Sequence, residues 1–308
     1  PRPTADVGAR GPPRPVSEGV FTLVVLAAGL GSRFGRLKQL EPVGPGGATL
    51  MDYSVFDARR AGCDDAVFII RPEMDDAFQK LAAARYGDRL RVRTAHQLPG
   101  EGRARPWGTG HALLSVASLV NGPFIVANAD DFYGAPAFDA AAAFARGDAG
   151  GTPPQWAVVG YRLRDTMSAE GGVNRAICQV ADGCLVGMEE ILGIVAAGGG
   201  MFTGRGARGS VTMPGAALVS MNMWVFTPNV CDVLREGFAR FVADPMATAS
   251  EYLLPTAIET AVRDGQARVR VLDPRCRWFG MTYPADRPAV SAALGALVRD
   301  GQYPEHLW

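Results

Sequence analysis

Apolar runs separated by glycine-rich and polar segments divide the chain into alternating predicted strands and helices. Residues 21–28, FTLVVLAA, are continuously apolar, which is typical of a strand buried on both faces of a parallel sheet. Residues 49–60 instead carry apolar side chains at helical spacing, and Gly62 follows as a stop signal. The alternation continues with predicted strands at 65–70, 89–95 and 123–129 and predicted helices at 73–85, 109–120 and 136–146. This order predicts βαβ units in a mostly parallel sheet with helices on both faces.

The second half of the chain has shorter apolar segments and reads as an extension of the same sheet. Two predicted strands, 174–180 and 184–190, flank an Ala-Asp-Gly turn, which favours a hairpin. Residues 196–215 carry many glycines and little core material, so we expect a mobile loop there. The remaining expected elements are strands at 156–161, 216–226 and 268–272 and helices at about 228–243, 250–264 and 286–300.

Composition narrows the class of protein. The 308 residues hold 31 Lys+Arg and 31 Asp+Glu, and this balance gives no general attraction to nucleic acid or to an anionic membrane. Five scattered cysteines without a C-x-x-C pair favour reduced thiols in a cytoplasmic protein. No apolar run reaches the length of about 18 residues that a membrane helix needs. Residues 1–19 are rich in Pro, Gly and Arg and are expected to be a disordered leader.

A glycine-rich loop follows the first predicted strand. It contains Gly29, Gly31 and Gly35 together with the cations Arg33 and Lys38. Ligands of open α/β sheets bind beyond the carboxyl ends of the strands. Glycines let backbone N–H groups approach an anion closely, and Arg and Lys complement phosphate oxygens. The loop therefore predicts a triphosphate site.

Two other phosphate-binding loops do not fit this segment. Gly29 and Gly31 lack the third glycine of the dinucleotide fingerprint, and the second predicted strand runs into Arg71 and Pro72 instead of ending in an acid. The G-x-x-x-x-G-K-[ST] pattern of a P-loop is absent. A tight strand–helix connection without a ligand is the remaining alternative.

Residues 26–40, LAAGLGSRFGRLKQL, resemble the signature loop of the sugar-1-phosphate nucleotidyltransferases, roughly L-A-A-G-x-G-x-R followed by a lysine. The resemblance implies a three-layer α/β/α fold with a mixed, mostly parallel central sheet, Rossmann-type and GT-A-like, as in nucleotide-diphospho-sugar transferases. It implies one domain over residues 20–308, with a nucleotide-binding half at about 20–150 and an acceptor half at about 151–308.

The resemblance also implies roles for individual loop residues. Catalytic neutralisation of the phosphates falls on Arg33 and Lys38. The pair Lys38-Gln39 is equally similar to the cytidylyltransferase of isoprenoid biosynthesis and to molybdenum-cofactor guanylyltransferases, so the loop does not choose the base. The implied nucleotide-binding residues of the loop are Ala27, Ala28, Gly29 and Gly31.

A second segment bears on the base and ribose. Residues 107–114, WGTGHALL, resemble the L-G-T-x-H-A segment of uridylyltransferases, which implies nucleotide contacts for Gly108, Thr109 and His111. Gln97 resembles the glutamine that those enzymes place on a uracil edge, where an amide donates and accepts at once. The alternatives are a capped helix histidine for His111 and a surface amide for Gln97.

Two carboxylates end the predicted strand at 123–129. Mg²⁺ takes oxygen ligands and binds through one or two carboxylates plus substrate phosphates. Asp130 is the predicted Mg²⁺ ligand, because the family has its Gly-Asp pair at this point, and Asp131 is either a second ligand or a cap of the next turn. Many relatives carry their second acid in W-x-D-x-G-T, but Gly280 stands there in this chain. Asp286 follows within TYPADRP, which is similar to a cytidylyltransferase segment.

Three residues of the second half are the candidates for sugar binding. GGVNRA resembles the Y-G-x-V segment of the family and points to Gly172, and MEE resembles V-x-E-K-P and points to Glu190. A solvated hairpin acid is the alternative for Glu190. Asn222 is an amide inside an otherwise apolar predicted strand, and a buried amide needs partners. EYLLP, at 251–255, resembles a segment whose role in the family is mainly architectural.

These features together predict nucleotidyl transfer. A phosphorylated small-molecule acceptor attacks the α-phosphorus of an NTP and pyrophosphate leaves, with UTP and a sugar 1-phosphate as the preferred pair. Cytidylyl or guanylyl transfer to another phosphorylated acceptor is the first alternative, supported by Lys38-Gln39 and Gly280. A non-catalytic nucleotide-binding protein is the second, and a glycosyltransferase, whose D-x-D motif is missing, is the third. The oligomeric state is not indicated.

Overall fold

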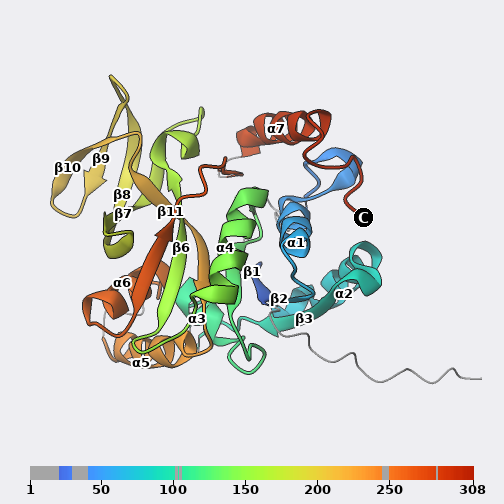
Figure 1. Ribbon diagram of the computed structural model, residues 1–308, viewed down its shortest axis with the longest axis horizontal. Coiled ribbons are helices and arrows are strands. Elements are labelled where there is room, and N and C mark those ends of the chain that lie inside the picture. Colours follow the sequence, from blue (N-terminus) through green and yellow to red (C-terminus); the bar gives the residue numbers. More distant parts are fainter. Residues whose placement is uncertain (1–20, 30–40, 101–102, 104–105, 245–249, 282–283) are drawn as a thin grey trace, which may run out of the picture.

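One large sheet carries strands from both halves of the chain (Figure 1). The computed structural model describes residues 21–29, 41–100, 103, 106–244, 250–281 and 284–308. The strands of the sheet are β1 (Thr22–Leu26), β2 (Asp65–Ile70), β3 (Arg91–His96), β4 (Phe124–Asn128), β6 (Gln155–Arg162), β7 (Val173–Ala181), β8 (Cys184–Gly198), β9 (Met201–Gly206), β10 (Gly209–Pro214), β11 (Leu218–Phe226) and β12 (Arg268–Leu272). Their order is β10-β9-β8-β12-β6-β11-β4-β1-β2-β3, and β7 pairs with β11 and β8.

The direction of the strands confirms a mixed sheet. β1 lies parallel to β2 and β4, and β2 lies parallel to β3, as the strand–helix alternation predicts. β11 is antiparallel to both of its neighbours, β4 and β6, while β6 is parallel to β12. Because β4 and β6 are both antiparallel to β11, they run in the same direction as each other. The carboxyl ends of β1, β4, β6 and β12 therefore all lie at one edge of the sheet.

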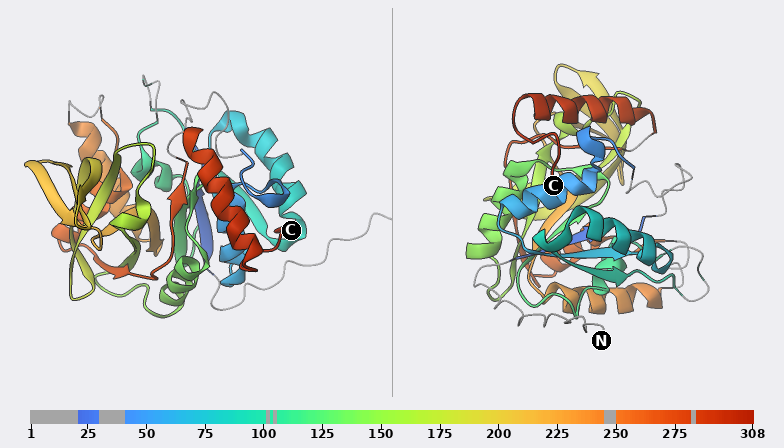
Figure 2. Two further views of the ribbon diagram at one scale, coloured as in Figure 1. Left: turned by 90° about the horizontal axis from the view of Figure 1, so that it is seen from above. Right: turned by 90° about the vertical axis from the view of Figure 1, so that its right-hand side faces the viewer.

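Helices cover both faces of the sheet, which confirms the three-layer architecture (Figure 2). Side chains alternate across a strand, so β1 sends Leu23 and Val25 into one core and Val24 into the other. The first core is closed by residues of α1, α2 and α4, and the second by residues of α3, α5 and α6. The helices are α1 (Leu50–Arg60), α2 (Asp75–Arg85), α3 (Thr109–Leu114), α4 (Ala135–Gly147), α5 (Val230–Ala243), α6 (Leu254–Arg263) and α7 (Arg287–Arg299).

The start of α1 is fixed by its own sequence. Thr49 is the N-cap, and its side chain accepts from the backbone N–H of Asp52 at 3.3 Å. The Asp52 carboxylate in turn accepts from the Thr49 backbone N–H at 2.7 Å, which completes a capping box. Gly62, with φ 101°, follows the helix as predicted. Such a cap contributes about 1 kcal/mol and holds the helix that follows the glycine-rich loop.

The predicted hairpin between β7 and β8 is confirmed, but the loop predicted at 196–215 is wrong. Asp182 and Gly183 both have positive φ, as a two-residue hairpin turn of type I′ requires. β8 runs on to Gly198, and β9 and β10 form a further hairpin. Gly199 and Gly200, both with positive φ, make the turn between β8 and β9, and residues 207 and 208 make the turn between β9 and β10. Almost no residue of β9 and β10 is buried, so these strands lack the apolar pattern on which the prediction depended.

The C-terminal segment completes a third, smaller hydrophobic core next to the end of β4. β5 (Asp131–Phe132) pairs with β13 (Phe279–Gly280), and the Phe132 and Phe279 rings stack with centroids 4.4 Å apart. Val290 and Leu294 of α7 pack into the same cluster.

The predicted helix at 109–120 is helical only to Leu114 and ends in turns. None of the described helices is long and apolar enough to cross a membrane.

Candidate active site

The candidate site lies where β1 and β4 end side by side. Leu26 and Asn128 are register partners, and the Ala129 N–H donates to the Leu26 carbonyl at 3.1 Å, so the segments after both strands remain adjacent. Ala27 and Ala28 are buried there, and Gly29 follows. The predicted residues Gly31, Arg33 and Lys38 lie outside the described residues. The start of the glycine-rich loop therefore adjoins the two predicted metal-binding acids.

A cavity of about 380 Å³ opens at this edge of the sheet. It gathers four residues that the sequence singled out: Asp130, Asp131, Glu190 and Asn222. Gly172 is not in its lining and packs against Gly193 at the start of β7. Residues for which the sequence offered no role in the site also line the cavity, namely Asn128, Asn174, Arg175, Ala176, Ser220, Met221, Pro255, Trp278 and Met281.

Asp131 is held by a chain of side-chain hydrogen bonds that starts at Trp224. The indole Nε1 of Trp224 donates to Oδ1 of Asn222 at 2.9 Å. Nδ2 of Asn222 donates to Oδ1 of Asn128 at 2.9 Å, and Nδ2 of Asn128 donates to Oδ2 of Asp131 at 2.8 Å. The buried Tyr133 hydroxyl lies 3.2 Å from the same Oδ2.

Trp224 sets the direction of this series of hydrogen bonds. An indole N–H only donates, so Asn222 turns its oxygen to Trp224 and its nitrogen to Asn128. Asn128 is then turned in the same sense, and its nitrogen faces Asp131. Asp131 is thus held in position by residues from β4 and β11.

Gly280 explains why a carboxylate at position 131 suits this chain. It is the register partner of Asp131 across the β5–β13 pair. A Cβ on Gly280 would collide with Oδ1 of Asp131 and would lie 2.9 Å from Cζ2 of Trp278. The side chain of Asp131 therefore occupies the space that an acid at position 280 would need.

Arg175 is a buried cation in the wall of the cavity, and no sequence motif pointed to it. It is 8% exposed, and its guanidinium lies 5.1 Å from the ring of Trp278. Nε donates to the Thr166 hydroxyl at 3.1 Å, and Nη1 donates to the Asn174 carbonyl at 2.8 Å. Burial lowers the pKa of Arg175, and the nearby carboxylates of Asp131, Glu190 and Asp286 oppose that shift. The available signal was an arginine inside the apolar run of β7.

Trp278 adds an indole N–H to the same wall. The residue is 8% exposed and lines both the 380 Å³ cavity and a smaller one of about 160 Å³ beside it, which also contains Arg175 and Asp286. Its Nε1 is buried and has no hydrogen-bond partner within the described part of the chain. A buried donor of this kind calls for an acceptor, which a ligand oxygen would provide.

The segment around Gly108 is explained first by its packing. Gly108 has φ 99°, and a Cβ there would lie 2.8 Å from the Tyr252 carbonyl oxygen. The Thr109 hydroxyl accepts from the Leu254 backbone N–H at 3.0 Å, at the start of α6. This contact supports the architectural role expected for 251–255. Nucleotide contacts of Gly108 and Thr109 stay predictions.

Gln97 and His111 flank that segment. Gln97 is 6% exposed, so the alternative of a surface amide is wrong; its Nε2 donates to the Gly108 carbonyl at 3.0 Å. The His111 ring centroid lies 4.7 Å from that of Phe238. Burial lowers the pKa of His111, and its Nδ1 is buried without a partner among the described residues. Neither the base contact of Gln97 nor that of His111 is tested by these contacts.

Comparison with known proteins agrees with the observed fold. Residues 23–130 match the family of the MobA-like NTP transferase domain. The chain has no match among curated proteins. Similar solved structures include the inositol-1-phosphate CTP transferase from T. maritima, with 16% identity and a TM-score of 0.64 over 90% of this chain and 96% of that one.

Two further structures have the same fold. A UDP-glucose pyrophosphorylase solved with UDP-glucose is 15% identical, with a TM-score of 0.56 over 89% of this chain and 98% of that one. A candidate glucose-1-phosphate thymidylyltransferase from Bacillus anthracis, in complex with a sucrose, is 14% identical, with a TM-score of 0.59 over 89% and 95%. The chain thus has the nucleotidyltransferase fold, and its residues 23–130 match the MobA-like NTP transferase domain.

Proposed function

We propose that this protein transfers a nucleotidyl group from an NTP to a sugar 1-phosphate, with UTP as the preferred nucleotide, and releases pyrophosphate. The observation that carries the proposal is the gathering of Asp130, Asp131 and Arg175 in one cavity beside the end of β1. Two acids to hold a metal and a cation to hold a phosphate are the groups that such a transfer needs. The products would be an NDP-sugar and pyrophosphate.

The two acids fit Mg²⁺. Among the described residues, no group of three or more His, Cys, Asp or Glu side chains is arranged to hold a metal. Mg²⁺ does not require such a group, because it binds through one or two carboxylates and completes its shell with phosphates and water. Asp130 and Asp131 would hold it. When bound, the metal neutralises charge on the phosphate oxygens.

Arg175 suits the phosphate of the acceptor. A guanidinium has five N–H groups, and three nitrogens of Arg175 already donate to Thr166 and Asn174. Two N–H groups remain for a ligand in the cavity. Trp278 supplies a further donor in the same wall, and Glu190 on the opposite strand of the hairpin accepts from sugar hydroxyls.

The reaction needs no general base. A phosphate oxygen of the acceptor is already a nucleophile at neutral pH, so the residues of the chain contribute position and charge. Arg175 orients the acceptor, and Asp131 keeps its place through Asn128 and Tyr133. Lys38 is assigned to the α-phosphate and Arg33 to the departing β- and γ-phosphates.

Cytidylyl or guanylyl transfer to another phosphorylated acceptor is the second candidate. Gly280 favours it, because the uridylyltransferase pattern has an acid where this chain has a glycine. Asp286, which lines the smaller cavity and accepts from Ser168 at 3.1 Å, also belongs to a segment similar to a cytidylyltransferase. The identity of the base separates the two candidates.

The deciding experiment is a screen for pyrophosphate release. The protein is incubated with Mg²⁺, each of the four NTPs and a panel of hexose 1-phosphates and inositol 1-phosphate, and products are identified by mass. UTP with a sugar 1-phosphate should give the fastest release. CTP or GTP as the better substrate would favour the second candidate, and no release with any pair would contradict nucleotidyl transfer.

Lys38→Ala gives a sharp internal test, because the chain has only one other lysine, Lys80. The variant should lose roughly 10²–10³ in rate, as expected for the removal of one charge-stabilising donor. Lys80 is exposed on α2, and Lys80→Ala should keep full activity. Equal rates in the two variants would refute the assignment of Lys38.

A further inference from the structure

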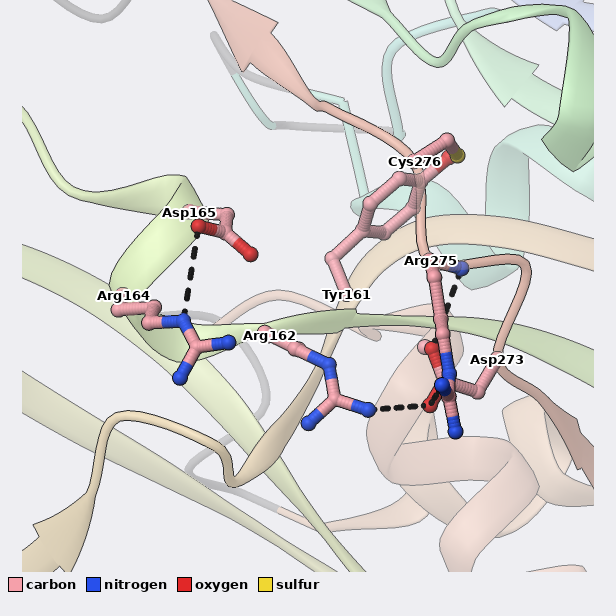
Figure 3. A pocket seen from close by; sticks show the side chains of 8 residues that line it. Tyr161, Arg162, Arg164, Asp165, Asp273, Arg275 and Cys276 are labelled. Carbon is pink, nitrogen blue, oxygen red and sulfur yellow. Dashed lines mark hydrogen bonds and ion pairs between the residues drawn. The ribbon is translucent and has the colours of Figure 1, made fainter.

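A second cavity, of about 410 Å³, shares no lining residue with the candidate active site. Figure 3 shows the side chains that line it. It is formed where β6 and β12 end. The first wall comes from residues 160–165 and the second from residues 273–276, after β12. Nothing in the proposed reaction uses this cavity.

Three arginines line the cavity, and two aspartates only partly neutralise them. Arg162 forms a close pair with Asp273, at 2.9 Å between Nη2 and Oδ2. Arg164 is 3.8 Å from Asp165, and Nε of Arg275 is 3.9 Å from Asp273. Three cations against two anions leave an excess of one positive charge in the lining.

Arg164 and Arg275 are available for a ligand. Their side chains are 56% and 79% exposed, and their ion pairs are too long for hydrogen bonds. Within the described part of the chain, their guanidinium groups donate no hydrogen bond. Exposed pairs of this kind contribute about 0–1 kcal/mol, so an anion can displace them at little cost.

The backbone presents Arg275 to the cavity in an unusual conformation. Arg275 has φ 52°, in the left-handed region, where a side chain costs roughly 1–2 kcal/mol. Its backbone N–H donates to Oδ1 of Asp273 at 3.2 Å, which stabilises the turn. A strained residue that presents a charged group at a cavity is a reason to look for a ligand.

The floor of the cavity is rigid. The Tyr161 hydroxyl donates to the Tyr133 carbonyl at 3.0 Å, and the Cys276 thiol lies 3.4 Å from the same oxygen. Both wall segments are therefore attached to the Tyr133 carbonyl, which holds the backbone that carries the arginines in place. Preorganisation lowers the cost of binding a ligand.

We propose that Arg164 and Arg275, together with Arg162, bind the phosphate group of a small hydroxyl-bearing molecule at a site separate from the catalytic one. Guanidinium forks match phosphate oxygens. A volume of 410 Å³ is within the range of small-molecule sites. Asp165 has oxygens that accept from hydroxyls of such a ligand. Tyr161 of the cavity contacts the Tyr133 carbonyl, and the Tyr133 hydroxyl contacts Asp131, so two tyrosines connect the site to the candidate metal ligand.

The test is a calorimetric titration of the full chain with inorganic phosphate, which requires no turnover. The variant Arg164→Gln/Arg275→Gln is compared with Arg205→Gln/Arg208→Gln, which removes the same charge from exposed positions in the β9–β10 hairpin. Phosphate should bind the wild type and the control alike and the first variant at least tenfold more weakly. Equal dissociation constants in the two variants, or no binding to the wild type, would overturn the proposal.

A second arm separates phosphate from carboxylate recognition. Malonate carries two negative charges on carboxylates, and it should bind the arginine cavity more weakly than phosphate does. Tighter binding of malonate, lost in Arg164→Gln/Arg275→Gln, would contradict the phosphate assignment. Circular dichroism of both variants verifies folding. Because the titration reads binding alone, its result is independent of the screen for pyrophosphate release.

Discussion

The carboxylate of Asp131 lies where a side chain at position 280 would be, so Gly280 leaves room for it. β5 and β13 are only two residues long, but their pairing sets this relationship. Asp131 on β5 thus fills the space that an acid at position 280 on β13 would need. We predict that Asp131 serves in place of that acid.

Exchange of the two residues tests this relationship directly. Gly280→Ala should displace Asp131 and Trp278 and lower the transferase rate at least tenfold, because its methyl group enters the space of both. Asp131→Gly should lower the rate further. The double variant Asp131→Gly/Gly280→Asp should recover part of that loss in an assay of pyrophosphate release. A double variant no faster than Asp131→Gly would contradict the prediction that Asp131 serves in place of an acid at position 280.

Asn222 combines a backbone requirement with a side-chain one. Its φ is 61°, so Asn222→Ala should cost roughly 1–2 kcal/mol of unfolding free energy, whereas Asn222→Gly should cost less. Both variants lose the donor to Asn128, so both should lower the transferase rate to a similar degree. Urea denaturation and rate measurements separate the two effects. A fully active Asn222→Gly would show that the series of hydrogen bonds from Trp224 does not orient Asp131.

Arg175 should affect the acceptor more than the nucleotide. We expect Arg175→Lys to raise the KM for the sugar phosphate at least tenfold and to change the KM for the NTP less than threefold, because a lysine keeps the charge but loses the fork. Arg205→Lys, at an exposed position on β9 and outside the 380 Å³ cavity, is the control. Equal changes in both KM values would indicate a general structural role for Arg175.

Asp57 predicts a pH dependence of stability that is unrelated to catalysis. Burial raises the pKa of Asp57 to about 7, although the Tyr303 hydroxyl donates to it at 2.6 Å. Between pH 4 and 7 the folded chain holds a proton here that the unfolded chain has lost. The contribution of Asp57 to stability should fall by up to about 1.4 kcal/mol per pH unit across this window and level off above pH 7.

Asp57→Asn removes that dependence. The amide still accepts from Tyr303, and it has no charge to desolvate. Thermal denaturation of the variant should therefore show a smaller drop in Tm between pH 5 and 8 than the wild type. A drop of equal size in both proteins would mean that Asp57 is ionised in the folded state.

Most of the architecture could be predicted from local patterns. The apolar run at 21–28, the cap at Thr49 and the Asp182-Gly183 turn each have a local physical cause, and each element appeared where expected. The β9–β10 hairpin did not, because an exposed strand stabilised by backbone pairing leaves no apolar period. Asp130, Asp131, Glu190 and Asn222 were nominated from sequence, and they line one cavity.

The relationships between those residues depended on the tertiary structure. The sequence does not reveal that the side chains of Asn222, Asn128 and Asp131 are joined by hydrogen bonds. They meet only because β11 pairs with β4 in the antiparallel sense. Nor does the sequence reveal that Arg175 lies against Trp278, or that Arg164 and Arg275 share a cavity. The sequence by itself determined which chemical groups the protein has and where its strands end. The sheet order decided which of those groups meet, because contacts between distant segments follow from strand pairing and not from local composition.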